Sequence, residues 1–144
     1  MNSKSLFSRM ITAIVLIMNV TAINAMPDSQ LYIKNNTSWD IKIKFAEPSR
    51  MNAAETPIRA GGVYPLGAIN NMYDIRYLSV MRYGRAEFMS GWTELDLNYL
   101  KQDSQRQLNE KEGVIPGYEK DIYWTILPTA TGWTAKVVNV QTKK

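Results

Sequence analysis

The 144-residue sequence contains neither cysteine nor histidine. Without cysteine the chain forms no disulfides, which sets it apart from the disulfide-stabilised domains common among small eukaryotic extracellular proteins. Without histidine it lacks the general base of the Ser-His-Asp and Cys-His nucleophile systems. Without either residue it also lacks the usual ligands of zinc, haem and iron–sulfur centres. We therefore expect no cofactor and no metal site, and most hydrolase mechanisms are excluded.

Motifs for phosphate and calcium are missing as well. No stretch has the GxxxxGK form, and Gly61-Gly62 lacks the lysine and the helix that this motif requires, so we interpret the pair as a turn. No Asp-x-Asp-x-Asp-Gly loop is present. The sequence therefore gives no indication of a nucleotide or calcium site.

The first 25 residues have the features of an export signal. Lys4 and Arg9 precede an apolar run over residues 10–18, and no further charge occurs before Asp28. The run is shorter than the roughly 20 apolar residues that span a bilayer, and the segment ends at Ala25, a small residue that suits a signal peptidase. We predict a signal peptide over 1–25, cleavage after Ala25, and a secreted or periplasmic protein with no transmembrane helix. The alternative is a retained membrane anchor.

The part of the chain that remains after cleavage, residues 26–144, has the length of a single domain. Lys4 and Arg9 are the only charged residues before the cut, so cleavage lowers the formal charge from +4 to +2. Nucleic-acid binders cluster lysine and arginine on a face or stripe, and a nearly neutral chain does not favour such a partner. We expect no nucleic-acid ligand. An exported chain that avoids thiols is typical of a bacterial protein.

Most apolar residues of this domain recur with a period of two, which is typical of half-buried strands. Alternation over residues 31–33 and 41–45, on either side of an Asn/Thr/Ser turn at 35–38, predicts a hairpin. A second hairpin is predicted around the turn at 128–132, with strands on both sides. Pro and Gly residues predict an irregular connection over 48–62.

Further strands are predicted at 63–66 and 73–83, with a turn at 67–71 between them and a return strand around 87–89. Strands separated by turn clusters at short intervals indicate an all-β fold, an antiparallel β-sandwich or small barrel. The domain is expected to contain at most one short helix, within residues 93–112.

Residues 93–112 carry two competing patterns. Leu95, Leu97 and Tyr99 alternate as in a strand, whereas the residues 93–96 resemble a capping box and Arg106 and Glu110 lie four residues apart, as on a helix. Gly113 would then end the helix. We expect a strand through about Tyr99, followed by a polar loop or short helix up to residue 112.

Paired carboxylates are the one catalytic arrangement that the composition leaves open. Glu94 and Asp96 would lie about 6.6 Å apart on one strand face, from two rises of about 3.3 Å, a separation within reach of glycosidase geometry. Alternating charge is also what any solvated strand face shows. A carboxylate-dependent carbohydrate-active enzyme is therefore an alternative to a binding function, and we assign no catalytic residue.

Aromatic residues are the feature most compatible with binding. The chain has eight tyrosines and four tryptophans, and such rings stack on sugars and anchor at lipid interfaces because they join an apolar body to a polar tip. Trp124 and Trp133 lie on cleanly alternating strands, which favours a place in the core. Trp39 and Trp92 lie at the edges of turns, where they are candidates for ligand binding.

A second candidate is the predicted hairpin tip Arg82-Tyr83-Gly84-Arg85, with Arg76 upstream. Its cations and ring would suit an anionic headgroup, a phosphate or an acidic glycan. Charged tips are also what edge hairpins commonly carry. The candidate ligand-binding residues are Trp39, Trp92, Arg82, Tyr83 and Arg85.

The run from Leu31 to Phe45 resembles the first hairpin of aegerolysin-like membrane-binding sandwiches, but it includes no functional motif of that family and implies no site residue. We interpret the chain as an exported binding module without enzymatic activity. Its expected partner is a protein, a glycan or an anionic lipid surface, recognised through exposed aromatic and basic residues. The alternatives are a membrane-binding or membrane-active sandwich and the carboxylate-dependent enzyme.

Overall fold

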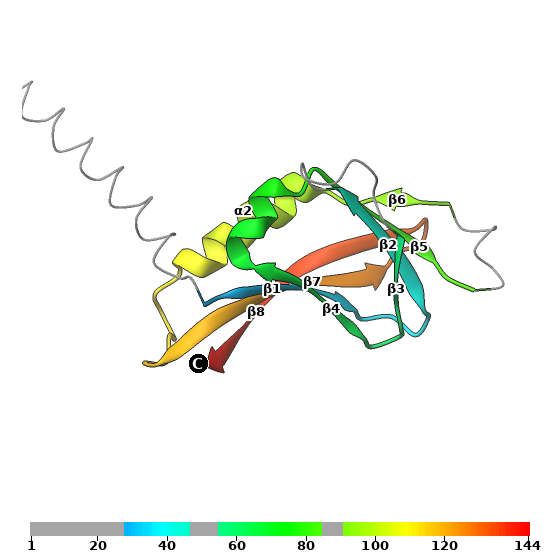
Figure 1. The fold of residues 1–144 in the computed structure, drawn as a ribbon. Helices are drawn as coiled ribbons and strands as arrows, with labels where there is room; N and C mark the ends of the chain where they lie inside the picture. Colours follow the sequence, from blue (N-terminus) through cyan, green and yellow to red (C-terminus); the bar gives the residue numbers. More distant parts are fainter. Residues whose placement is uncertain (1–27, 47–54, 85–90) are drawn as a thin grey trace, which may run out of the picture.

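The computed structural model describes residues 28–46, 55–84 and 91–144. The predicted signal segment 1–25 and the predicted strand at 87–89 lie outside these ranges. Figure 1 shows the strands and helices of the described part, which in chain order are β1 (Gln30–Asn35), β2 (Ile41–Ala46), β3 (Glu55–Ile58), β4 (Val63–Ala68), the 3-10 helix η1 (Ile69–Asp74), β5 (Tyr77–Arg82), β6 (Thr93–Glu94), α2 (Leu97–Asn109), β7 (Tyr118–Pro128) and β8 (Trp133–Lys143).

The strands form two four-stranded sheets, here called sheet A, with the order β4-β1-β7-β8, and sheet B, with the order β3-β2-β5-β6. The predicted all-β, sandwich-like fold is confirmed. One pair departs from the antiparallel arrangement, because β1 and β7 run parallel, with Leu31 opposite Ile122. Parallel neighbours need a long connection between them, and here that connection includes all of sheet B and both helices.

The apolar sides of the two sheets form the core. Alternate residues of each strand point inward, which is why the sequence shows a period of two. Side chains with no more than 1 % exposure come from both sheets: Leu31, Ile33, Ile122, Trp124 and Ile126 from sheet A, and Ile41, Ile43, Leu78 and Val80 from sheet B. The predicted C-terminal hairpin is confirmed, with β7 and β8 paired from Tyr118 opposite Lys143 to Pro128 opposite Trp133.

The predicted hairpin over 31–45 is wrong, because β1 belongs to sheet A and β2 to sheet B. The segment between them crosses from one sheet to the other and is held by the fully buried Asn35. Its Nδ2 donates to the carbonyl oxygens of Trp39 (2.8 Å), Arg59 (3.0 Å) and Ile58 (3.1 Å). Its Oδ1 accepts from the Thr37 hydroxyl at 2.7 Å and from the Thr37 amide at 3.2 Å. Alternation alone does not distinguish paired strands from strands in facing sheets.

Three other boundaries differ from prediction. The predicted irregular connection contains the short strand β3, which pairs with β2 at the edge of sheet B. An edge position tolerates Pro57, which has no amide hydrogen to donate. The predicted turn at 67–71 is the end of β4 followed by η1, and the long strand predicted from residue 73 begins at Tyr77.

The strand predicted through Tyr99 is also wrong, since β6 ends at Glu94 and α2 begins at Leu97. Asp96 is the N-cap, and its carboxylate accepts a hydrogen bond from the Tyr99 amide at 3.1 Å. The helix buries a stripe of residues spaced three and four apart: Leu97, Leu100, Ser104, Gln107 and Leu108. Packing of this stripe against sheet A is the physical reason that helix prevails over the local alternation.

The C-terminal half of α2 brings together Arg106 and Glu110, the residues that the sequence spaces four apart. The Arg106 guanidinium contacts Glu110 at 2.5 Å and Asp103 at 2.8 Å. Gly113 does not end the helix, because Glu110 is already its C-cap in an extended conformation. The carbonyl groups at the end of the helix instead accept hydrogen bonds from the buried ammonium of Lys120. Its Nζ donates to the Gln107 carbonyl at 2.7 Å and to the Glu110 carbonyl. A cation at this end also interacts favourably with the negative end of the helix dipole.

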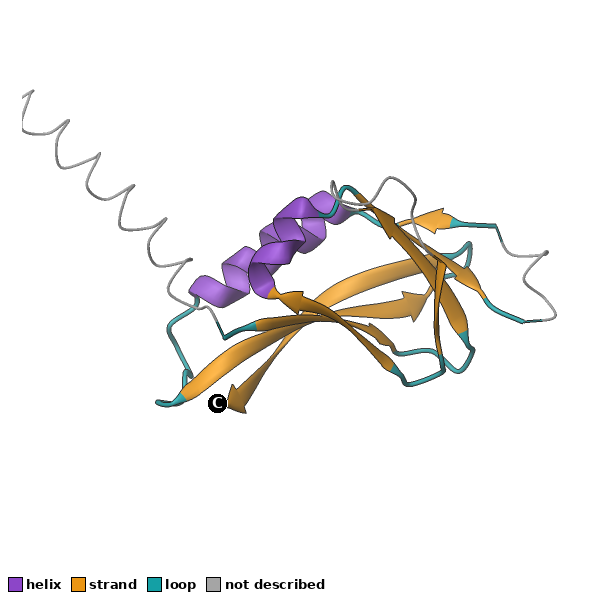
Figure 2. Cartoon of the chain, viewed as in Figure 1, coloured by secondary structure: helices purple, strands orange, loops and turns teal. Residues whose placement is uncertain are grey.

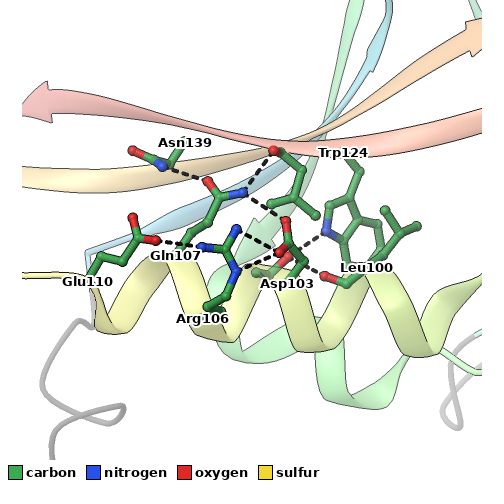
Figure 3. Close-up of polar contacts among 9 residues, drawn as sticks. Leu100, Asp103, Arg106, Gln107, Glu110, Trp124 and Asn139 are labelled. Carbon is green, nitrogen blue, oxygen red and sulfur yellow. Dashed lines mark hydrogen bonds and ion pairs between the residues drawn. The ribbon is translucent and has the colours of Figure 1, made fainter.

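A buried polar network joins α2 to sheet A (Figure 3). The indole Nε1 of Trp124 donates to the Ser104 hydroxyl at 2.8 Å. In the Gln107 side chain, Nε2 donates to the Val137 carbonyl at 2.9 Å and Oε1 accepts from Asn139 Nδ2 at 2.6 Å. Each of these polar groups is paired within the chain, so their burial costs little.

In Figure 2, α2 and sheet B lie on the same side of sheet A, α2 over one end of its strands and sheet B over the other. Within the described ranges, the opposite face of sheet A is left uncovered by any other element. Neither helix of these ranges is long and apolar enough to span a bilayer.

Candidate ligand-binding site

A pocket of about 350 Å³ opens at one end of the sandwich, where the turn between β7 and β8 meets the ends of β5 and β6. Its lining combines aromatic rings, a cation and hydroxyl groups from both sheets: Trp39, Arg82, Gly91, Thr93, Trp133 and residues 128–132. We call this the end pocket. It brings together Trp39 and Arg82, two of the residues predicted from the sequence.

Three side chains contact one another in series in the end pocket. The Arg82 guanidinium lies 5.0 Å from the centre of the Trp39 ring, and the Trp39 and Trp133 rings meet edge to face at 6.1 Å. Trp39 precedes β2 and is 37 % exposed, Arg82 ends β5, and Trp133 begins β8. Within the described ranges Arg82 has no carboxylate partner. Among the described residues no acidic side chain neutralises its charge.

The backbone around the end pocket is held on both sides. The Trp39 carbonyl accepts from Asn35 Nδ2 and the Trp39 amide donates to the Thr37 hydroxyl at 3.2 Å, so the crossing between the sheets fixes the tryptophan. On the other side, a Cβ at Gly132 would lie only 2.5 Å from the hydroxyl oxygen of Thr93. A larger residue at 132 would therefore force the Thr93 side chain to move, whereas glycine allows the close approach of the β7–β8 turn to β6.

Tyr83 and Trp92, the other predicted residues described by the structure, lie outside the end pocket. They belong to the outer face of sheet B, where each ring is covered by a lysine of β2. Lys42 Nζ is 4.9 Å from the Tyr83 ring centre, and Lys44 Nζ is 5.9 Å from the Trp92 ring centre. Lys42 also contacts Glu55 at 3.4 Å. The predicted set is thus divided between two neighbouring surfaces.

Arg85, the remaining predicted residue, lies outside the described residues. Arg82, predicted at a hairpin tip, is the last residue of β5, and its guanidinium lies against Trp39.

Trp133, predicted in the core, is half-buried: it packs against the core cluster and also lines the end pocket. The signal that selected Trp39, a tryptophan beside a turn, also applies to Trp133, which directly follows Gly132. The core position predicted for Trp124 is confirmed, because this side chain has no exposed surface.

The two candidate carboxylates have different surroundings. Asp96 is engaged as the N-cap of α2, whereas Glu94 is exposed on β6, opposite Ser79 of β5. No group of three or more acidic side chains in the described part of the chain is arranged to hold a metal ion.

Comparison of the chain with family models, with curated proteins and with solved structures gives no match. Its function is therefore inferred from the geometry of its surfaces.

Proposed function

We propose that the protein is an exported, non-enzymatic binding module that holds an acidic glycan in the end pocket. The observation that carries this proposal is the contact of Arg82 with Trp39, and of Trp39 with Trp133, at an exposed end of the sandwich. An aromatic face contacts the apolar face of a sugar ring, while a guanidinium binds a carboxylate or sulfate through two parallel hydrogen bonds.

The rest of the end pocket suits the same ligand class. Thr93, Thr129 and Thr131 supply hydroxyls that donate and accept, as the hydroxyls of a sugar require. A volume of about 350 Å³ lies at the lower end of the range for small-molecule sites, which suits one or two sugar residues of a longer chain. Because the Asn35 crossing fixes the Trp39 backbone, little conformational entropy is lost there when the ligand binds.

The proposal is tested by calorimetric titration with an oligogalacturonate, and with a neutral cello-oligosaccharide of the same length as comparison. We expect the acidic glycan alone to bind, with affinity that falls as salt rises. Arg82→Gln should weaken binding at least tenfold. Arg76→Gln is the matched control, because it removes the same charge from an exposed position outside the end pocket. Equal binding of the neutral glycan, or an unchanged affinity in Arg82→Gln, would contradict the proposal.

Export is part of the same proposal and has its own test. Protein recovered from its native host should begin at Met26 and lie outside the cytoplasm. An exported protein that retains Met1 would disprove cleavage after Ala25.

A membrane surface is the second candidate, favoured by the outer face of sheet B. Lys42, Lys44, Tyr83 and Trp92 gather there, and basic residues beside exposed aromatic rings suit an anionic lipid interface. Sedimentation with phosphatidylglycerol vesicles tests this candidate. Lys42→Gln/Lys44→Gln should reduce sedimentation while leaving oligogalacturonate binding unchanged. If the unmodified protein stays in the supernatant, the membrane candidate is eliminated.

A further inference from the structure

The uncovered face of sheet A has a hollow of its own, separate from the end pocket. Its volume is about 440 Å³, and its lining comes from β1, β7, β8, the start of β4 and the residue after β1: Lys34, Asn36, Val63, Tyr123, Thr125, Lys136, Val138 and Val140. It shares no lining residue with the end pocket. We call it the sheet A hollow.

Strand register places two lysines at one end of the sheet A hollow. Lys34 of β1 lies opposite Thr125 of β7, which in turn lies opposite Lys136 of β8. With adjacent strands about 4.8 Å apart, the two lysine backbones flank Thr125 at a separation of about 10 Å. Within the described ranges neither lysine has a carboxylate partner. This end therefore carries two cations whose charge the described residues do not neutralise.

The middle of the sheet A hollow is apolar. Tyr123 lies opposite Val138, and its ring stacks on that of Tyr32 at 4.8 Å with only 20° between the planes. Val140 follows on the same face of β8 and is 45 % exposed. From Lys136 to Val140 the strand rises about 14 Å, from four steps of about 3.4 Å. An apolar surface of this length thus extends from the two lysines.

Among the described residues that line the sheet A hollow, the two lysines place positive charge at one end only. At the other end Asp121, which lies opposite Val140, is buried and fully engaged: its carboxylate accepts from the Gln30 amide at 2.9 Å and contacts Lys144 Nζ at 3.1 Å. Neither group of this ion pair is left to attract a charged ligand. The sheet A hollow therefore combines a cationic end with an apolar body, and a ligand with a single anionic head complements it.

We propose that the sheet A hollow binds a small amphipathic carboxylate. Its carboxylate lies between Lys34 and Lys136, and its apolar chain or ring lies along Tyr123 and Val138 toward Val140. Charge complementarity positions the carboxylate. The apolar part of the ligand covers the exposed valines and removes their surface from contact with water. This site does not depend on the glycan site, since the two use different residues.

The test is a ¹H–¹⁵N NMR titration of the protein with sodium octanoate, in which the backbone amide signals of β7 and β8 are monitored. We expect saturable shifts at residues 123–125 and 136–140. Lys34→Gln/Lys136→Gln should weaken binding at least tenfold. Val140→Asp should weaken it as well, because it places a negative charge on the path of the apolar chain. Lys42→Gln/Lys44→Gln, with the same charge change on the other sheet, and Arg82→Gln should bind octanoate as the unmodified protein does.

Two ligand controls separate the parts of the proposal. Sodium acetate carries the head without the body, and 1-octanol carries the body without the charge; both should bind at least tenfold more weakly than octanoate. Acetate binding as tightly would leave only a simple anion site, and octanol binding as tightly would leave only an apolar surface; either result overturns the proposal. So does octanoate binding that persists in the double lysine variant, or no shift at all. Should the double variant unfold, Lys34→Gln and Lys136→Gln alone should each weaken binding.

Discussion

Trp124 and Trp39 lie in two contrasting regions of the same sandwich. Trp124 is fully buried, and its indole nitrogen donates to Ser104 of the helix that packs on it. Trp39 lies at the exposed end, where its ring contacts a cation that has no carboxylate partner in the described residues. Around Trp124 each polar group is satisfied by the chain itself, whereas around Trp39 charge and aromatic surface are left to the solvent.

This difference separates the residues that stabilise the fold from those that recognise a ligand. A buried, fully paired network contributes to stability and has nothing to offer a partner. An exposed aromatic ring with an unneutralised cation contributes little to stability and retains the capacity to bind. Substitutions in the two regions should therefore affect different measurements.

The largest effect is expected for Trp124→Ala. Removing a buried tryptophan leaves a cavity and costs about 3–5 kcal/mol of unfolding free energy. The Ser104 hydroxyl also loses the hydrogen bond that it accepts from the indole and keeps only the one that it donates to the Leu100 carbonyl. Urea denaturation measures the loss. Trp124→Phe should cost less, since it fills most of the space. A loss below about 1 kcal/mol, typical of surface substitutions, would place Trp124 outside the core and break the comparison.

Asn35→Ala should have the next largest effect. It removes the side-chain hydrogen bonds to the carbonyls of Ile58, Arg59 and Trp39, each of which contributes about 0.5–1.5 kcal/mol. Because Asn35 also fixes the Trp39 backbone, oligogalacturonate binding should weaken in the same variant. The neighbouring exposed Asn36→Ala serves as control in urea denaturation and should stay within about 0.5 kcal/mol. Equal stability of the two variants would refute the role of Asn35.

Trp39→Ala should weaken ligand binding strongly and change stability little. An exposed cation–π contact contributes about 0.5–1 kcal/mol, so the urea midpoint should change little. Oligogalacturonate binding should fall at least tenfold, because the ring is the stacking surface of the end pocket. Trp92→Ala, which removes a similarly exposed tryptophan on the outer face of sheet B, should leave this binding unchanged. Loss of binding in Trp92→Ala alone would move the site to that face.

The smallest effect is a pH dependence at the uncovered face of sheet A. Burial, with the neighbouring Tyr32 and Asp121, raises the pKa of Tyr123 above its ordinary value of about 10. The folded chain then holds this proton more tightly than the unfolded chain, so the stabilisation is complete below about pH 10 and is lost as the pH rises toward the higher folded pKa. Tyr123→Phe should lose less stability between pH 9 and pH 11 than the unmodified protein. The exposed Tyr99→Phe is the control, and an identical pH slope in all three proteins would contradict the assignment.

Local patterns predicted the strands well and their partners less well. The C-terminal hairpin was predictable because a short turn fixes the pairing of β7 with β8. The crossing at residues 35–38 was not, because alternation is the same for strands in one sheet and strands in two facing sheets. The first turn of α2 was predicted as the end of a strand, and the rest as a polar loop or short helix. The stripe that α2 buries depends on contacts with sheet A that are distant in sequence.

The end pocket was predictable only in part, for the same reason. Trp39 and Arg82 were identified separately, one beside a turn and one at a presumed hairpin tip. Their contact depends on the pairing of β2 with β5, and the contribution of Trp133 depends on the other sheet. Residue type indicated which side chains suit a ligand, whereas long-range pairing determines which of them meet.

The most direct test follows the indole N–H signals of the four tryptophans by ¹H–¹⁵N NMR during titration with oligogalacturonate. The indoles of Trp39 and Trp133 should shift together and saturate with one dissociation constant, while the indole of Trp124, held by Ser104 in the core, should stay in place. A titration in which binding leaves Trp39 and Trp133 unmoved, or in which Trp124 shifts as much as they do, would contradict the division between a stabilising and a binding region.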